Sequence, residues 1–324
     1  MIFLRTMGKK NSVQVRSAVL HLITTLLRIW VGLSIEDIFM ERMSGAMTNS
    51  VFCVNVHGES RMKLEPKEPS KLLLRIYGQG IDWMFSRRRE LECTMRLAEA
   101  GISPRWLGIF GNGRFEEFVF NIPVTSEMVR DPEISKMIAR KLWHLHHKVD
   151  VVIQSPPEDI DEPQKSILWK RLSAWRTKAL EALKKTPQVP AALQQILTNP
   201  RFDHEFRRLK EACKEVASPM VLCHNDLHQG NLMIKKEDLS LILIDFEYAA
   251  LGPRGFDIAN HFCEWAADYQ AENSSILDYA NRFPSLEQQL LFCRAYCDEA
   301  EQTKAISIDP ERLFLEVQAY IPIS

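Results

Sequence analysis

Short apolar runs separated by polar connectors fill the first 120 residues, a pattern that predicts strands rather than long helices. Two helices are expected there, over residues 14–31 and 84–100, and the second is expected to end at Gly101. Asn112-Gly113 is a hairpin signal between the last two strands. The expected strands cover residues 38–43, 50–57, 71–77, 106–110 and 114–120. The pattern therefore predicts a mostly antiparallel sheet with a helix across it.

From Thr125 onward apolar residues recur every three or four positions, which predicts helices. A hairpin interrupts them, because two short apolar runs, 231–234 and 241–245, are joined by a polar stretch. If Ile234 pairs with Leu241, Asn231 lies opposite Ile244 and beside Asp245. Helices are expected over residues 134–147, 165–185, 190–198 and 203–215, and again from about 256. We expect an α+β fold with two domains, residues 1–122 and 123–324.

The apolar stretch over residues 18–32 requires comparison with a membrane span. It is shorter than the roughly 20 apolar residues that cross a bilayer, and no signal-peptide cleavage pattern follows it. Polar side chains also recur along it at helical spacing and form a stripe, namely Ser17, His21, Thr24, Thr25 and Arg28. We therefore expect a packed amphipathic helix and no membrane span.

Composition excludes some partners. Charged residues make up 26% of the 324 positions and the formal net charge is -1, so no global field favours nucleic acid or an anionic membrane. Seven cysteines without CxxC spacing fit reduced thiols better than a disulfide framework. The chain is therefore expected in the cytoplasm, without a nucleic-acid partner.

The most informative chemistry lies in residues 224–231, His-Asn-Asp-Leu-His-Gln-Gly-Asn, followed by the run that ends at Asp245. Asp226 is placed to accept a proton from a substrate hydroxyl. Asn231 and Asp245 can offer oxygen atoms to one magnesium ion, which needs only one or two protein ligands when phosphates supply others. A base, an amide and a metal carboxylate are sufficient for phosphoryl transfer, in which the protein mostly positions groups and neutralises charge.

Two simpler interpretations compete with this one. A single aspartate in a loop is usually a turn or cap residue. His224 and His228 flank Asp226 and suggest zinc, but no third or fourth ligand is spaced near them. His224 is better explained as a residue that orients the loop through hydrogen bonds.

The continuation of this motif resembles a known family. Residues 244–248, Ile-Asp-Phe-Glu-Tyr, and 254–265, Arg-Gly-Phe-Asp-Ile-Ala-Asn-His-Phe-Cys-Glu-Trp, are similar to the signature of choline/ethanolamine kinases. Upstream segments 44–49, 72–78 and 112–118 resemble the nucleotide lobe of that family, in particular of fungal-like choline kinases. The resemblance implies a bilobal protein-kinase-like fold, with an N-terminal nucleotide-binding lobe and a mainly helical C-terminal catalytic lobe. It also implies ATP and Mg²⁺, and the conversion of choline to phosphocholine in phospholipid synthesis.

Nucleotide-binding residues are expected in the first half. The turn that contains Ser44, Thr48 and Asn49 can aim backbone N–H groups and hydroxyls at phosphates, although such runs are often ordinary turns. A buried Arg75, in the middle of a strand, needs a partner. Glu90 is the natural candidate, while Glu92 or exposure to solvent are alternatives.

The resemblance implies the same pair of Arg75 and Glu90, with Arg75 in contact with the nucleotide phosphates. It also implies that the segment from Glu117 to Val119 forms the hinge whose backbone binds adenine.

The acceptor side is expected on the helix that includes Asp257. Asn260, Glu264 and Asp268 fall near the same face as Asp257, and Trp265 and Tyr269 are four residues apart. Acidic and aromatic side chains together suit a quaternary or primary ammonium group. Alternatively, Asp257 caps the helix and Trp265 belongs to the core.

With the resemblance, the expected substrate-binding residues are Glu247, Asn260, Glu264, Trp265 and Tyr269.

The C-terminal end departs from the family pattern. Relatives continue into a tryptophan-bearing helix that walls the choline site, whereas Trp265 is the last tryptophan here and the chain stops at Ser324. We therefore expect a shortened C-terminal lobe. An ethanolamine kinase and a truncated nucleotide-binding pseudoenzyme are the alternative functions, and a homodimer is compatible with the resemblance.

Overall fold

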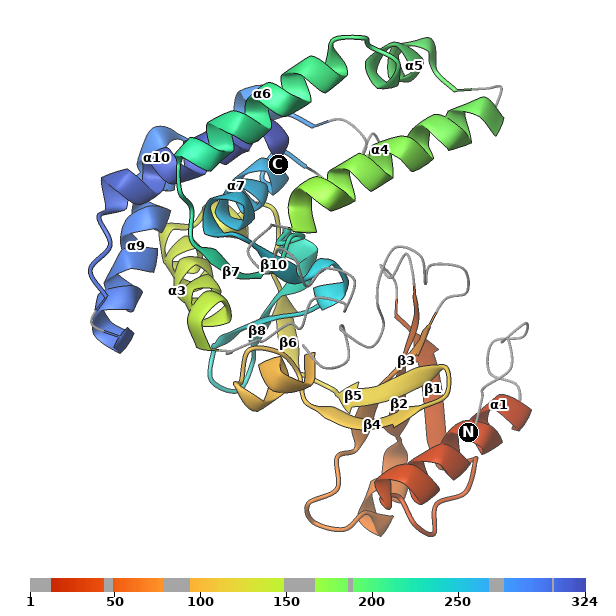
Figure 1. Cartoon of the computed structure of the whole chain (residues 1–324). Coiled ribbons are helices and arrows are strands. Elements are labelled where there is room, and N and C mark those ends of the chain that lie inside the picture. Colours follow the sequence, from red (N-terminus) through yellow and green to blue (C-terminus); the bar gives the residue numbers. More distant parts are fainter. Residues whose placement is uncertain are drawn as a thin grey trace, which may run out of the picture. The chain divides into compact units, whose positions relative to one another are not determined.

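The computed structural model describes residues 13–43, 49–77, 94–148, 167–185, 189–267, 277–304 and 306–324. The chain divides into two compact units, shown with their elements in Figure 1. The first unit comprises Met1–Asn121 and Lys235–Ile242, and the second comprises Ile122–Ile234 and Leu243–Ser324. The first boundary lies one residue before the expected one. The tip of the hairpin is grouped with the first unit instead of the second.

A five-stranded sheet forms the first unit, with the order β1-β2-β3-β5-β4 and antiparallel pairing throughout. Its strands start and end within about three residues of their expected bounds. They are β1 (Ile38–Arg42), β2 (Asn49–Val56), β3 (Lys71–Tyr77), β4 (Trp106–Phe110) and β5 (Gly113–Glu117). Arg75 in β3 is paired with Arg114 in β5, which brings two cationic residues onto neighbouring strands.

The hairpin between β4 and β5 differs from the expected turn. Phe110 pairs with Gly113, so Gly111 and Asn112 occupy the loop, one residue earlier than predicted. Gly113 is required for a different reason: a Cβ atom there would lie 2.5 Å from the carbonyl oxygen of Arg75 and 2.5 Å from the ring of Phe110. The glycine thus permits the close approach of β5 to β3.

The first helix is shorter than predicted. Helix α1 (Val13–Leu22) continues into a π-helical turn, η1 (Ile23–Leu27), and ends at Arg28, whose φ of 58° is left-handed. The hydroxyls of Thr24 and Thr25 donate to the carbonyls of Leu20 and His21 at 3.0 and 2.6 Å. Such bonds compete with the helical backbone pattern, which explains why the predicted helix over 14–31 stops early.

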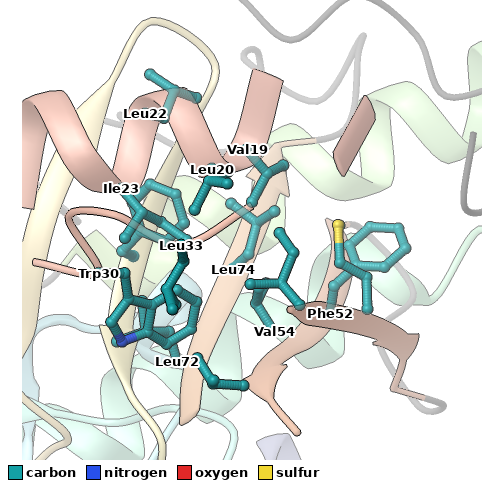
Figure 2. Close-up of a cluster of buried hydrophobic side chains, with 14 residues drawn as sticks. Val19, Leu20, Leu22, Ile23, Trp30, Leu33, Phe52, Val54, Leu72 and Leu74 are labelled. Carbon is teal, nitrogen blue, oxygen red and sulfur yellow. The ribbon is translucent and has the colours of Figure 1, made fainter. Parts of the chain in front are cut away.

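Helix α1 buries its apolar face against the sheet, as Figure 2 shows. Val19 and Leu22 meet strand residues such as Leu72 and Leu74 in one buried cluster. Trp30 is fully buried with them, and its Nε1 donates to the carbonyl of Pro69 at 2.7 Å. This confirms the packed amphipathic helix. Across the described segments, none of the helices has the length and apolar character needed to traverse a bilayer.

Part of the second predicted helix lies in the described residues. Residues 94–99 are helical, and Gly101 follows with a φ of 70°. That left-handed conformation confirms Gly101 as the terminating glycine. The remainder of the predicted range, residues 84–93 with Glu90, lies outside the described residues.

The second unit is mainly helical. Antiparallel strands β7 (Met220–Cys223) and β10 (Ala250–Pro253) pair beside its helices. Helix α3 packs against α9, and α7 packs against α10. The helices are α3 (Pro132–Lys148), α4 (Ile167–Lys185), α5 (Ala191–Leu197), α6 (Phe202–Glu215), α7 (Arg254–Glu264), α8 (Tyr279–Arg282), α9 (Leu286–Lys304) and α10 (Pro310–Tyr320). All the helices predicted after Thr125 are confirmed, within about two residues at each end.

A small sheet carries the predicted hairpin. Its order is β6-β8-β9, with bounds Asn121–Pro123, Leu232–Lys235 and Leu241–Leu243. The backbone N–H of Ile244 donates to the carbonyl of Asn231 at 3.0 Å. The predicted register, with Asn231 opposite Ile244, is therefore confirmed, and it places Asp245 one residue beyond that pair.

Candidate active site

Asp226 and Asn231 are joined directly within the second unit. The loop after β7 turns at Asn225, whose φ is 63°, and reaches a short 3₁₀ helix over Gln229–Asn231. The side-chain amide of Asn231 donates to the backbone carbonyl of Asp226 at 2.8 Å and to its carboxylate at 3.0 Å. Because the amide nitrogen is used in this way, Oδ1 of Asn231 is the atom available to a cation.

Asp245 follows β9 in a left-handed conformation, with φ 63° and ψ 68°. This backbone is uncommon outside glycine, although aspartate tolerates it better than most residues, and it is typical of functional sites. The N–H of Ile244 is bonded to Asn231, so the register holds Asp245 beside the amide. The charge of Asp245 is close enough to raise the pKa of Asp226.

Three carboxylates act on Asp226 at this site. Burial raises the pKa of Asp226 to about 7, and the negative charges of Glu264, Asp245 and Glu247 act in the same direction. Glu247 lies in the 3₁₀ turn after Asp245, and Glu264 ends α7. Like charges at close range disfavour one another. The group therefore forms a region of negative potential that favours bound cations.

The donor set fits magnesium better than zinc. Carboxylate and amide oxygens are hard ligands of the kind that magnesium prefers. Within the described ranges, three or more His, Cys, Asp or Glu side chains are nowhere grouped so as to hold a metal ion. Asn231 and Asp245 could supply the one or two protein ligands of a phosphate-bound magnesium.

Helix α7 anchors the loop that carries Asp226. Asp257 is fully buried, and its carboxylate accepts the backbone N–H groups of His224 at 2.8 Å and Asn225 at 2.7 Å. Burial disfavours its charge, but the contacts that favour the charge, among them the hydrogen bonds from His146 and from the N–H of Asn225, outweigh burial and lower its pKa. The alternative in which Asp257 caps the helix is wrong, because Pro253 occupies the N-cap position.

Two further residues of α7 hold the same loop. Asn260 accepts the N–H of Leu227 at 3.3 Å, and Nδ1 of His261 lies 2.8 Å from the carbonyl of Leu227. The structure thus gives Asn260 a contact with the loop, where a substrate contact was expected. His261 was missed, although its spacing of four from Asp257 puts it on the same helix face.

His224 has the orienting role predicted for it. Its side chain is buried, and Nε2 lies 3.0 Å from the carbonyl of Ile244. His228 approaches the carboxylate of Asp226 at 3.7 Å, and burial lowers its pKa, which favours the neutral ring. The two histidines therefore support the loop on either side of Asp226.

Trp265 occupies the core. Only 2% of its surface is exposed, Nε1 donates to His261 at 3.2 Å, and the guanidinium of Arg130 lies 5.4 Å from its ring centroid. Other side chains of the protein therefore surround the ring, which agrees with the alternative that Trp265 belongs to the core. Tyr269 and Asp268 lie outside the described residues.

The first unit contains a buried charge cluster. Glu116 in β5 is bonded to Arg114 at 2.5 Å and lies 3.3 Å from Arg75, and all three are nearly inaccessible. Burial opposes ionisation of Glu116, but the two arginines hold its pKa below the usual value. The guanidinium of Arg114 lies 4.1 Å from the ring centroid of Trp106. Glu116 is thus a partner of Arg75 that the sequence did not reveal.

Of the other candidate nucleotide-binding residues, some lie within the described residues and some do not. Asn49 is the first residue of β2 and pairs with Tyr77, while Ser44 and Thr48 lie outside the described residues. Glu117 binds the exposed Arg105 at 2.5 Å through its side chain. The carbonyl of Val119 accepts the side-chain amide of Asn121 at 2.9 Å. The nucleotide roles of these residues stay predictions.

Comparison with known proteins gives a consistent family. The family model for choline/ethanolamine kinase matches residues 40–324. Probable choline kinase 2 of Arabidopsis thaliana is 32% identical over 279 residues, which cover 86% of this chain and 73% of that protein. The crystal structure of choline kinase from Cryptosporidium parvum Iowa II aligns with a TM-score of 0.76 at 25% identity, covering 94% of this chain and 85% of that chain. A Plasmodium vivax ethanolamine kinase aligns with a TM-score of 0.71 at 25% identity, covering 96% and 80%.

These likenesses establish the α+β, protein-kinase-like fold, with an antiparallel sheet in the N-terminal part and helices in the C-terminal part. Asp226, Asn231 and Asp245 lie within the matched region, and their roles stay predictions. The chain belongs to the choline/ethanolamine kinase family, and it is accordingly a phosphotransferase that acts on an alcohol group.

Proposed function

We propose that this chain transfers the γ-phosphoryl group of ATP to the hydroxyl of choline, with magnesium as the metal. The observation that carries the proposal is the bonded pair of Asp226 and Asn231, set among the charges of Asp245, Glu247 and Glu264. The substrate oxygen forms a bond to the γ-phosphorus while the bond to the bridging oxygen of ADP breaks. Asp226 takes the hydroxyl proton or orients the hydroxyl for attack.

Asn231 and Asp245 are proposed to hold the magnesium. Bound there, magnesium would neutralise part of the charge on the phosphates. Arg75 is proposed to contact nucleotide phosphates in the first unit, where Glu116 fixes its side chain. Ser44, Thr48, Asn49, Glu117 and Val119 complete the proposed nucleotide-binding set.

Glu247 and Glu264 are proposed to attract the ammonium group of the acceptor. Both raise the pKa of Asp226, so both lie near the proposed reacting hydroxyl. A quaternary ammonium also gains from aromatic faces, yet Trp265 is buried and contacts Arg130. This observation favours ethanolamine as a second candidate, because a primary ammonium can donate hydrogen bonds to carboxylates and needs fewer aromatic contacts.

A substrate panel on the purified protein decides between these functions. ATP turnover is measured with choline and with ethanolamine in the presence of magnesium, and kcat/KM is compared. A higher value for choline supports the first candidate, and the reverse supports the second. ATP binding in a thermal shift assay without turnover on either amine would make the chain a nucleotide-binding pseudoenzyme.

We further propose that the product, phosphocholine or phosphoethanolamine, supplies phospholipid synthesis in the cytoplasm. A homodimer is also proposed, and sedimentation velocity distinguishes it from a monomer.

A further inference from the structure

A buried chain of hydrogen bonds leads from α9 to the loop of Asp226. His146 in α3 has no exposed side-chain surface. Its Nε2 lies 3.0 Å from the carboxylate of Asp257, and its Nδ1 lies 2.7 Å from the hydroxyl of Tyr296 in α9. Tyr296 is also fully buried. Helix α3, which precedes α7 and α9 by more than 100 residues in sequence, therefore meets both of them behind the loop.

One arrangement of protons satisfies all these contacts. The Asp257 carboxylate can only accept, so Nε2 of His146 donates. Burial lowers the pKa of His146 and favours the neutral ring, so Nδ1 carries a lone pair. The hydroxyl of Tyr296 must then donate to Nδ1, and burial raises its pKa, which keeps that proton in place. Tyr296 thus fixes the tautomer of His146.

The geometry at Asp257 links this chain to the loop. Its Oδ2 accepts both Nε2 of His146 at 3.0 Å and the N–H of His224 at 2.8 Å, and its Oδ1 accepts the N–H of Asn225 at 2.7 Å. A carboxylate can rotate about its last side-chain bond unless several donors fix it. His146 is the only side chain among these three donors.

We infer that His146 and Tyr296 are positioning residues for phosphoryl transfer. They hold the Asp257 carboxylate in the plane in which it binds the backbone of His224 and Asn225. That backbone carries Asp226, so a rotation of the carboxylate shifts the group that meets the substrate hydroxyl. The kinetic part of this inference rests on the proposed function, whereas the effect on the loop does not.

Two hydroxyls between α3 and α9 provide matched variants. Tyr296→Phe removes the hydroxyl that reaches the loop through His146. Thr303→Val removes the hydroxyl that accepts the Nε1–H of Trp143 at 2.8 Å between the same two helices, a bond that is not part of the chain from Tyr296 to Asp257. His146→Leu removes the donor to Asp257, and His146→Gln restores a side-chain donor.

Hydrogen exchange of the segment over residues 221–231 is the first measurement, because it needs no substrate. We expect faster exchange in Tyr296→Phe and His146→Leu than in Thr303→Val. The variants are compared at the same interval below their thermal midpoints, so that a difference in global stability does not enter. Equal exchange in all three variants would overturn the inference, whether or not the protein phosphorylates either amine.

Steady-state kinetics is the second measurement. We expect Tyr296→Phe to lower kcat about threefold to tenfold and His146→Leu about tenfold to a hundredfold, with the KM for ATP nearly unchanged. His146→Gln should recover most of that loss, and Tyr296→Phe should add little in the His146→Leu background. A fall in kcat of the same size in Thr303→Val would overturn the inference, because it would show that these substitutions lower kcat only by destabilising the packing of α3 against α9.

Discussion

Asn231 donates its side-chain amide to both the backbone carbonyl and the carboxylate of Asp226, at 2.8 and 3.0 Å. The expected metal-binding residue therefore also fixes the expected base. Because the nitrogen of the amide serves Asp226, the oxygen is left for a cation. The expected roles of general base and metal ligand, which the sequence analysis gave to separate residues, therefore depend on one hydrogen-bonded pair.

Asp226→Asn should abolish most of the activity while leaving the fold intact. We expect kcat to fall about 10²- to 10⁴-fold, since general base catalysis is worth that much. The thermal midpoint should stay equal or rise, because the change removes one of several mutually repelling carboxylates. Coupled ATP turnover and thermal denaturation check this. Asp298→Asn, an exposed acid on α9, is the control, and a fully active Asp226→Asn protein would remove Asp226 from the mechanism.

Glu116→Gln should weaken both stability and nucleotide use. It leaves Arg75 and Arg114 buried without their shared counter-charge, which typically costs about 3–5 kcal/mol. Urea denaturation measures the loss, and the KM for ATP should rise because Arg75 loses its ion pair with Glu116. Arg105→Gln breaks an exposed pair and should change stability by less than about 1 kcal/mol. An unaltered KM for ATP in folded Glu116→Gln protein would show that Arg75 does not contact the nucleotide.

Glu264 and Trp265 should respond differently to substitution. Glu264→Gln removes charge near Asp226, so we expect kcat/KM for the amine to fall about tenfold, equivalent to about 1.4 kcal/mol. Trp265→Phe should lower the thermal midpoint, because it removes a buried indole and its bond to His261, with little change in the KM for the amine. A large rise in that KM for Trp265→Phe would instead place the ring at the substrate.

The protein should lose stability as the pH falls from about 6.5 towards 4. Burial lowers the pKa of His261 to about 4 in the folded state, so the unfolded chain binds a proton first. The contribution of His261 to the free energy of unfolding is therefore fully present above the pKa that His261 has in the unfolded chain. It is lost as the pH falls from there through the pKa of the folded state. At pH 5 the loss from His261 is about 2 kcal/mol.

Urea midpoints at pH 7.5 and pH 5 measure this difference. His261→Asn should reduce the dependence on pH, whereas His204→Asn, at an exposed position of α6, should preserve it. An unchanged dependence in His261→Asn would assign the effect to other buried groups.

The sequence alone determined the features that depend on neighbouring residues. Alternation over 50–57 predicted β2, and the two apolar runs with a polar connector predicted the register that pairs Asn231 with Ile244. These succeed because strand period and turn chemistry act over a few residues. The prediction that Asp226, Asn231 and Asp245 form the site rests on the same kind of local spacing.

The tertiary structure decided which distant residues meet. It gave Arg75 the partner Glu116, placed Trp265 in the core and made Asp257 the anchor of the loop. No local period encodes such contacts, because each depends on how strands and helices from separate parts of the chain pack. The link from Tyr296 through His146 to Asp257 joins positions more than 100 residues apart, and only the packing of three helices brings them together.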